Sequence, residues 1–181
     1  PLDNYENVLK FLKYAIDKNG LNIEAKRITI STCGLVDKIY ELSEINSEIN
    51  LAVSLHATND EVRSQLMKIN KKWNISELLK ACKVYNKNTK KSILFEYIMI
   101  NDINDYEDDA KRLSKLLKDL NCKVDLIPAN DSENERFKPS SSEQINKFVN
   151  ILKINDINVS VRGTVGGDIK AACGQLRAEK L

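Results

Sequence analysis

The chain has 181 residues, of which 42% are hydrophobic and 30% charged, and its 28 basic and 26 acidic side chains leave a net charge of +2. Such a composition is typical of a globular domain, and a chain of this length buries roughly two-thirds of its unfolded surface. No apolar run approaches the roughly 20 residues of a membrane-spanning helix, so we expect no membrane partner, and the near-balanced charge argues neither for nor against a polyanionic one.

Helix and strand patterns alternate along the chain. Apolar residues three or four positions apart predict helices, and β-branched or continuous apolar runs between turn signals predict strands. In chain order we predict a helix over 8–16, a strand over 27–32, a helix over about 36–43, a strand over 49–55, a helix ending at 66, a helix over 76–85, a strand over 92–100, a helix over 106–120, a strand over 122–128, a helix over 143–154 and a strand over 157–162. Thr58 or Asn59 can cap the third of these helices.

This alternation predicts an α/β fold. Several predicted strands lack polar alternation, which indicates burial on both faces by flanking helices and hence parallel βα units. Consecutive right-handed units wind either into an open doubly wound sheet or around a barrel. No G-x-G-x-x-G sequence follows a predicted strand, so the usual dinucleotide fingerprint is absent and we favour a complete or partial barrel. In both folds a ligand sits at the carboxyl ends of the strands.

Small polar side chains gather where the predicted strands end. Ser31 and Ser54 either satisfy strand-end backbone groups or contact a ligand, and no neighbouring base and acid mark them as nucleophiles. His56 is the single histidine, and we expect it to hydrogen-bond the backbone rather than to transfer protons. Asn130 precedes a polar loop and is typical of a turn. These hydroxyls, amides and the imidazole suit a polar small molecule with amino, carboxylate and ribose groups.

Two carboxylates, Glu96 and Asp125, lie in the middle of predicted strands. Carboxylates are unusual in a packed core, so an inward-facing Glu96 or Asp125 could meet a ligand amine. The strand ends themselves hold no dense carboxylate cluster, so we do not expect a divalent-metal hydrolase.

The four cysteines are far apart and form no C-x-x-C pair. This spacing favours a reducing compartment over a disulfide scaffold or a closed zinc site. Cys33, Cys82 and Cys122 lie on or beside predicted elements, where a cysteine is usually a small buried apolar residue. Cys173 instead lies among small residues near the end of the chain. A thiol on a glycine-flanked segment can reach into a cleft, and its thiolate is a strong nucleophile.

Five segments occur in order along nearly the whole chain and together carry a family resemblance. They are ITISTCG (28–34), NLAVSLHATNDEVRSQLMKINKKW (50–73), FEYIMINDIND (95–105), KVDLIPAN (123–130) and DIKAACGQL (168–176). The S-L-H-A sequence with the charged run after it, and the A-A-C-G-Q-L sequence, are the most specific. On these motifs the chain resembles the radical-SAM adenine methyltransferases of ribosomal RNA, the RlmN/Cfr family.

The resemblance implies a partial (βα)6 radical-SAM barrel, here lacking its first strands, that binds S-adenosylmethionine (SAM) beside a [4Fe–4S] cluster. It implies methylation of carbon 2 of an adenine in 23S rRNA, with some tRNAs as further substrates, or of carbon 8 in the resistance branch. A tail cysteine, by motif Cys173, would first take a methyl group from one SAM. A second SAM, cleaved by the reduced cluster, would give the radical that abstracts hydrogen from this methylcysteine. By motif match, the SAM contacts are Ser31, Ser54, Leu55, His56 and Asn130.

The match has a clear gap, because the family's C-x3-C-x2-C cluster motif is missing. We therefore expect residues 1–163 to be the C-terminal portion of the barrel and 164–181 to be a flexible tail with the methyl-carrier cysteine. This chain alone should bind no cluster and should have no activity. Its exposed sheet edges should favour self-association. The resemblance further implies a cytoplasmic location and, for the complete enzyme, a reductant such as flavodoxin or ferredoxin.

Two alternatives remain open at this point. The chain could belong to a diverged radical-SAM paralogue with another nucleic acid or protein as its target. It could instead be a non-catalytic scaffold that binds SAM or RNA. Methylation of rRNA that lacks the modification tests the first alternative, and calorimetry with SAM and with an rRNA stem-loop tests the second.

Overall fold

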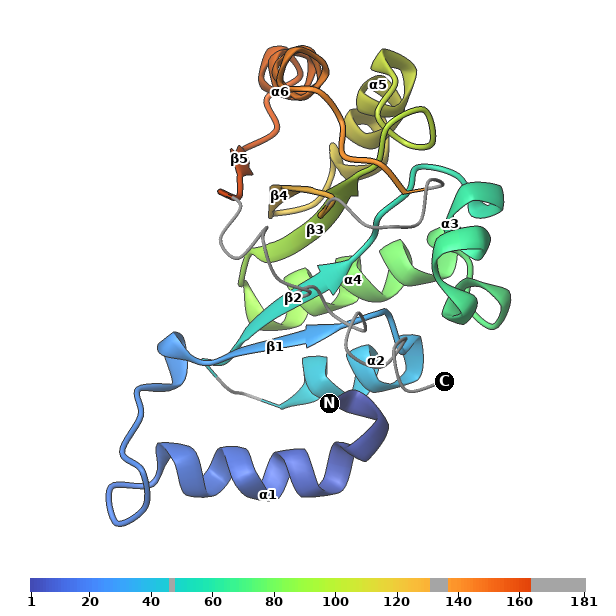
Figure 1. The fold of residues 1–181 in the computed structure, drawn as a ribbon. Helices are drawn as coiled ribbons and strands as arrows, with labels where there is room; N and C mark the ends of the chain where they lie inside the picture. Colours follow the sequence, from blue (N-terminus) through green and yellow to red (C-terminus); the bar gives the residue numbers. More distant parts are fainter. Residues whose placement is uncertain (46–47, 131–136, 164–181) are drawn as a thin grey trace, which may run out of the picture.

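A computed structural model of the chain describes residues 1–45, 48–130 and 137–163, which form one five-stranded sheet with helices packed against it (Figure 1). Every predicted strand is present, and the differences from prediction are confined to the strand ends. The strands are β1 (Thr29–Thr32), β2 (Asn50–Ser54), β3 (Ile93–Met99), β4 (Cys122–Pro128) and β5 (Val159–Val161).

The helices likewise follow the predicted pattern. They are α1 (Tyr5–Ile16), α2 (Val36–Glu44), α3 (Asp60–Leu66), α4 (Ile75–Thr89), α5 (Glu107–Leu117) and α6 (Ser142–Ile154), with short 3-10 helices η1 (Leu2–Asn4), η2 (Ala25–Arg27) and η3 (Lys68–Lys71). Helix α4 is longer than predicted. It ends where Lys90 adopts a left-handed backbone with φ of 59° and donates its N–H to the carbonyl of Asn86.

The sheet topology distinguishes the two predicted folds. The strands lie in the order β1-β2-β3-β4-β5, and every neighbouring pair is parallel. A doubly wound sheet reverses its strand order at a switch point, whereas a barrel adds each strand beside the previous one. The sequential order is therefore that of a partial barrel, as predicted, and all five strands point their carboxyl ends toward the same edge.

The two faces of the sheet differ in burial, which corrects the prediction that helices cover both. On the outer face, the β3 side chains Phe95 and Tyr97 are fully buried under the helices, and the Tyr97 ring lies 5.5 Å from that of Phe148 on α6. On the inner face, β3 presents half-buried residues in regular alternation, whereas Ser31 of β1 is exposed and Ala52 of β2 is buried. Leu94 and Ile98 of the inner face are apolar. The apolar run of β3 is therefore nearly continuous in the sequence, although the burial of its residues alternates.

A cap at the carboxyl end of β2 fixes where α3 begins. The side chain of Asn59 accepts the backbone N–H of Val62 at 2.9 Å, so Asn59 rather than Thr58 is the cap. Thr58 instead donates its hydroxyl to buried Asp109 on α5 at 2.6 Å. Helix α3 thereby starts at Asp60, after the short segment 55–59 that follows β2, and lies at the carboxyl edge of the sheet (Figure 1).

The predicted tail over 164–181, including Cys173, lies outside the described residues. In the part of the chain that the structure does describe, no helix combines the length and the apolar character needed to cross a bilayer.

Candidate functional site

The fold brings all five of the predicted ligand-contact residues to one edge of the sheet. Ser31 lies near the end of β1 and Ser54 at the end of β2, and Leu55 and His56 follow Ser54 directly. Half-buried Asn130 comes two residues after β4, at the same edge of the sheet.

Glu96 of β3 joins the two serines. Both hydroxyls donate to the same carboxylate oxygen, Oε2, from Ser31 at 3.2 Å and from Ser54 at 3.3 Å. Ser54 is the direct register partner of Glu96. The carboxylate lies on the inner face of the sheet, and only 16% of its side chain is exposed. The serines are therefore oriented toward one acidic group rather than toward backbone alone.

A second carboxylate, Asp125, continues this row on β4. It is the register partner of Glu96 on one side and of Ser160 on the other. The Arg162 guanidinium donates to Asp125 Oδ2 through Nε at 2.9 Å and Nη2 at 2.7 Å, and to Glu96 Oε1 through Nη2 at 3.1 Å. Ser160 donates to Asp125 Oδ1 at 3.1 Å. Two carboxylates thus share one guanidinium, so the charge of Arg162 compensates only one of Glu96 and Asp125.

His56 has a strained backbone and a neutral ring. Its φ is 59°, in the left-handed region that is uncommon for residues other than glycine. Its ring Nδ1 accepts the backbone N–H of Ile98 at 3.2 Å, so the neutral ring carries its proton on Nε2. Burial lowers the pKa of His56 to about 4, against an opposing contribution from Glu96. The ring of His56 therefore hydrogen-bonds the backbone, and its burial favours the neutral form at neutral pH.

The side chain of Leu55 is fully buried in the core. Its backbone carries its hydrogen bonds, since the N–H donates to the carbonyl of Glu96 at 3.0 Å and the carbonyl accepts from Arg63 at 3.1 Å. Only the main chain of Leu55 is placed to act at this edge.

Arg63 is a buried cation under the edge that the sequence analysis did not single out. It lies on α3 with no exposed surface. Its guanidinium donates to the carbonyls of Leu55, Cys33 and Ser54 at 3.1, 2.9 and 3.2 Å, and to the side chain of Asn70 at 2.9 Å. Burial lowers its pKa from the ordinary arginine value. One side chain thus ties the carboxyl end of β2 to the segment after β1.

Gly34 lies against the Arg63 guanidinium, at a position where the packing leaves little space for a side chain. The glycine has a φ of 106°, and a Cβ at this position would lie 3.2 Å from Arg63 Nη2 and 3.1 Å from a Leu78 methyl group. A side chain would therefore be strained by both the backbone and the contacts.

A second buried polar residue, Asn104, ties β2 to β3. It is 1% exposed. Its amide nitrogen donates to the carbonyls of His56 at 2.8 Å and Ile98 at 2.7 Å, and its amide oxygen accepts the N–H of Ile100 at 2.8 Å. The left-handed backbone at His56 is therefore stabilised by the hydrogen bond that the Asn104 amide donates to the His56 carbonyl. The sequence analysis quoted this residue within FEYIMINDIND without assigning it a role.

The three cysteines in the described part of the chain differ in exposure and do not form a metal site. Cys33 is exposed at the edge, whereas burial raises the pKa of the Cys82 thiol to about 12 and that of Cys122 to about 11. Among the residues described, no three His, Cys, Asp or Glu side chains are grouped to hold a metal ion. The described residues therefore do not fit an iron–sulfur cluster.

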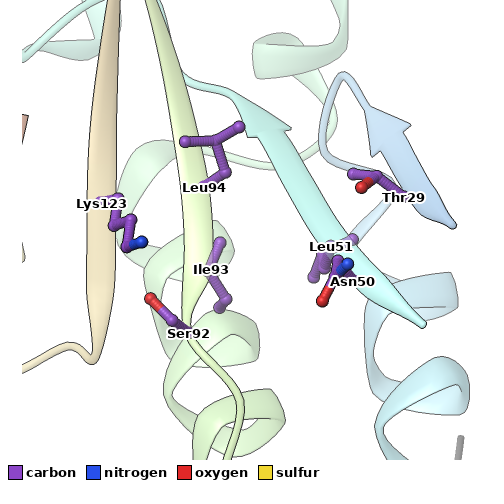
Figure 2. Close-up of a pocket in the computed structure, with 7 residues that line it drawn as sticks. All are labelled: Thr29, Asn50, Leu51, Ser92, Ile93, Leu94 and Lys123. Carbon is purple, nitrogen blue, oxygen red and sulfur yellow. The ribbon is translucent and has the colours of Figure 1, made fainter. Parts of the chain in front are cut away.

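A hollow of about 260 Å³ lies at the opposite end of the strands (Figure 2). It is lined by the first residues of the strands, among them Thr29, Asn50 and Lys123. In barrels of parallel strands the amino-terminal end contributes to stability while ligands bind at the carboxyl end. The position of the hollow gives it no part in the candidate site.

Comparison with solved structures first defines the class of protein. The fold matches the crystal structure of a radical SAM methyltransferase from Sphaerobacter thermophilus with a TM-score of 0.92 and 42% sequence identity, over 97% of this chain and 51% of that one. No family model matches the chain.

Curated relatives narrow this class. Over 177 residues, or 98% of this chain, the sequence is 52% identical to a protein of Clostridium botulinum (strain Alaska E43 / Type E3) and 48% identical to one of Clostridium perfringens (strain SM101 / Type A). Both are named probable dual-specificity RNA methyltransferase RlmN. Over nearly its whole length, this chain is therefore similar to proteins named RlmN and to a solved radical SAM methyltransferase. It spans about half the length of the curated relatives it matches, 51% in both cases.

Proposed function

We propose that this chain is the SAM-binding C-terminal part of a radical-SAM RNA methyltransferase. The observation that carries the proposal is the polar carboxyl edge of the sheet, where Ser31 and Ser54 both donate to Glu96 and where His56 follows Ser54 by two residues. The chain is 52% identical to a probable RNA methyltransferase over 177 residues. The edge offers hydroxyls, a carboxylate and a neutral imidazole donor, and this donor set fits a nucleoside that carries amino and carboxylate groups.

Ser31, Ser54 and Asn130 would hold SAM through their side chains. Leu55 would contribute the second lone pair of its backbone carbonyl, because its N–H donates to the carbonyl of Glu96. His56 would donate its Nε2 proton to an acceptor atom of the cofactor, because its Nδ1 is already engaged by Ile98. When bound, SAM supplies the methyl group and, on reductive cleavage, the radical chemistry of the family. Arg63 and Asn104 would keep the backbone of this edge in place during binding.

We further propose that Cys173 is the methyl carrier. It lies in the A-A-C-G-Q-L sequence and outside the described residues, and its support is the motif match alone. The proposed target is carbon 2 of an adenine in 23S rRNA, with tRNA as a second substrate, in a cytoplasmic reaction that uses flavodoxin or ferredoxin as reductant. The words "dual-specificity RNA methyltransferase" in the names of the relatives support an RNA target.

The 181 residues contain no C-x3-C-x2-C sequence. We therefore propose that this chain by itself holds no [4Fe–4S] cluster and does not methylate RNA. Activity would require the remaining half of the length found in the relatives.

Two experiments test the proposed function. Isothermal titration calorimetry of the chain with SAM should give one site per chain, with ATP as the control that shares the adenosine but lacks methionine. A chimera that joins this chain to the N-terminal half of the Clostridium botulinum relative should methylate 23S rRNA from a strain that lacks the modification. Absence of SAM binding would refute the cofactor assignment, and a chimera that binds SAM but leaves the RNA unmodified would refute the target.

A further inference from the structure

Glu96 lies at the centre of the candidate site and is not among the residues that the family motifs assign to SAM. It is on β3, the middle strand of the described sheet, and faces the inner side. Its carboxylate collects donors from β1, β2 and the segment after β5 through Ser31, Ser54 and Arg162. Groups that are distant in the sequence thus converge on one acidic side chain.

The two serine contacts to Oε2 of Glu96 are long. The two serine hydroxyls lie at 3.2 and 3.3 Å from Oε2, whereas O–H···O hydrogen bonds in proteins are usually about 2.7–2.8 Å long. An ionised carboxylate offers about four acceptor positions, and the hydrogen bonds of the described residues fill three of them. Glu96 can therefore accept a further and shorter hydrogen bond.

The serines reinforce this property. Because each hydroxyl proton points to Glu96, the remaining lone pairs of Ser31 and Ser54 are available as acceptors. The three side chains together form a small acceptor-only surface, and the matching ligand group must donate hydrogen bonds.

Asp125 does not share this availability. Arg162 donates two hydrogen bonds to its Oδ2, at 2.9 and 2.7 Å, and Ser160 donates to its Oδ1 at 3.1 Å. The guanidinium therefore mainly compensates Asp125, and the surplus negative charge of the pair lies on Glu96. A ligand with a cationic centre, such as the sulfonium of SAM, is favoured beside this charge.

We propose that Glu96, with Ser31 and Ser54, is the subsite that accepts hydrogen bonds from a donor group of SAM, either its ribose hydroxyls or its α-ammonium. The inference rests on the proposed function. It assigns Glu96 a direct cofactor contact and gives Asp125 only an electrostatic and structural part.

The test compares two matched substitutions in the 181-residue chain. Glu96→Gln and Asp125→Asn each remove one negative charge and one Arg162 partner, but only the first changes the group that faces Ser31 and Ser54. By calorimetry, Glu96→Gln should weaken SAM binding about tenfold or more, and Asp125→Asn by no more than about threefold. Melting temperatures of both variants confirm that each is folded at the temperature of the titration.

Two SAM analogues then identify the donor, one lacking both ribose hydroxyls and one lacking the α-amino group. For the analogue that has lost the donor facing Glu96, the chain with Glu96→Gln should bind as tightly as the unmodified chain. Equal losses from the two substitutions, or a full Glu96→Gln penalty with both analogues, would overturn the subsite. SAM binding that is unchanged by Glu96→Gln would refute the subsite and leave the proposed function intact. No SAM binding by the unmodified chain would refute both.

Discussion

Replacing Arg63 by lysine tests whether one buried guanidinium holds the carboxyl edge together. Arg63 donates four hydrogen bonds, three of them to backbone carbonyls. A lysine keeps the charge but has its three donors on one nitrogen, so it cannot span acceptors that lie on opposite sides of a guanidinium. At least two buried acceptors would lose their partner, at about 1–2 kcal/mol each. We therefore expect Arg63→Lys to lower the free energy of unfolding by about 2–4 kcal/mol.

Urea unfolding measures this loss, followed by circular dichroism and by fluorescence of Trp73, the single tryptophan. With a slope of about 2 kcal/mol per molar urea, the midpoint should fall by about 1–2 M. Arg112→Lys is the matched control, because Arg112 is on α5 with 46% of its side chain exposed, and its loss should stay below about 1 kcal/mol. Equal shifts for the two variants would refute the reasoning.

Three further predictions concern single side chains. In the chimera, Cys173→Ala should abolish RNA methylation while Cys33→Ala retains it, and methylation by the first variant would remove Cys173 from the mechanism. In the folded chain, iodoacetamide at pH 8 should modify exposed Cys33 at least about 100-fold faster than Cys82, whose thiol has a pKa raised by burial to about 12; peptide mapping by mass spectrometry measures both rates, and similar rates would contradict the buried position. The ring proton resonances of His56, the single histidine, should titrate near pH 4 rather than 6.5. The unfolded chain takes up a proton on His56 near pH 6.5, whereas the folded chain takes it up only near pH 4. The contribution of His56 to the free energy of unfolding is therefore complete above pH 6.5 and falls by up to about 3 kcal/mol as the pH drops from 6.5 to about 4. An NMR midpoint near 6.5 would contradict the burial of the ring.

The positions of Ser31 and Ser54 could be predicted from the sequence because they depend on local pattern. Each serine closes an apolar run, and parallel strands bring such ends to one edge. From the sequence, a barrel could be preferred to a doubly wound sheet only because no G-x-G-x-x-G sequence follows a predicted strand. The observed strand order identifies the partial barrel directly.

The roles of Arg63 and Asn104 could not be predicted from pattern. Both are in polar stretches, and polar residues are ordinarily exposed. Their burial arises because α3 and the loop after β3 fold back under strand ends that are distant in the sequence. The Glu96–Asp125 row is an intermediate case, since the sequence indicates mid-strand carboxylates but not that Arg162 compensates mainly one of them.

The choice of acceptors by Arg63 has an evolutionary consequence. Three of its four partners are main-chain oxygens, at Cys33, Ser54 and Leu55, and every amino acid carries such an oxygen. Side chains at positions 33 and 55 can therefore diverge among relatives without loss of the hydrogen bonds that Arg63 donates there. Asn70 is the exception, because it offers a side-chain oxygen, so a substitution at position 70 removes one of the four hydrogen bonds of Arg63.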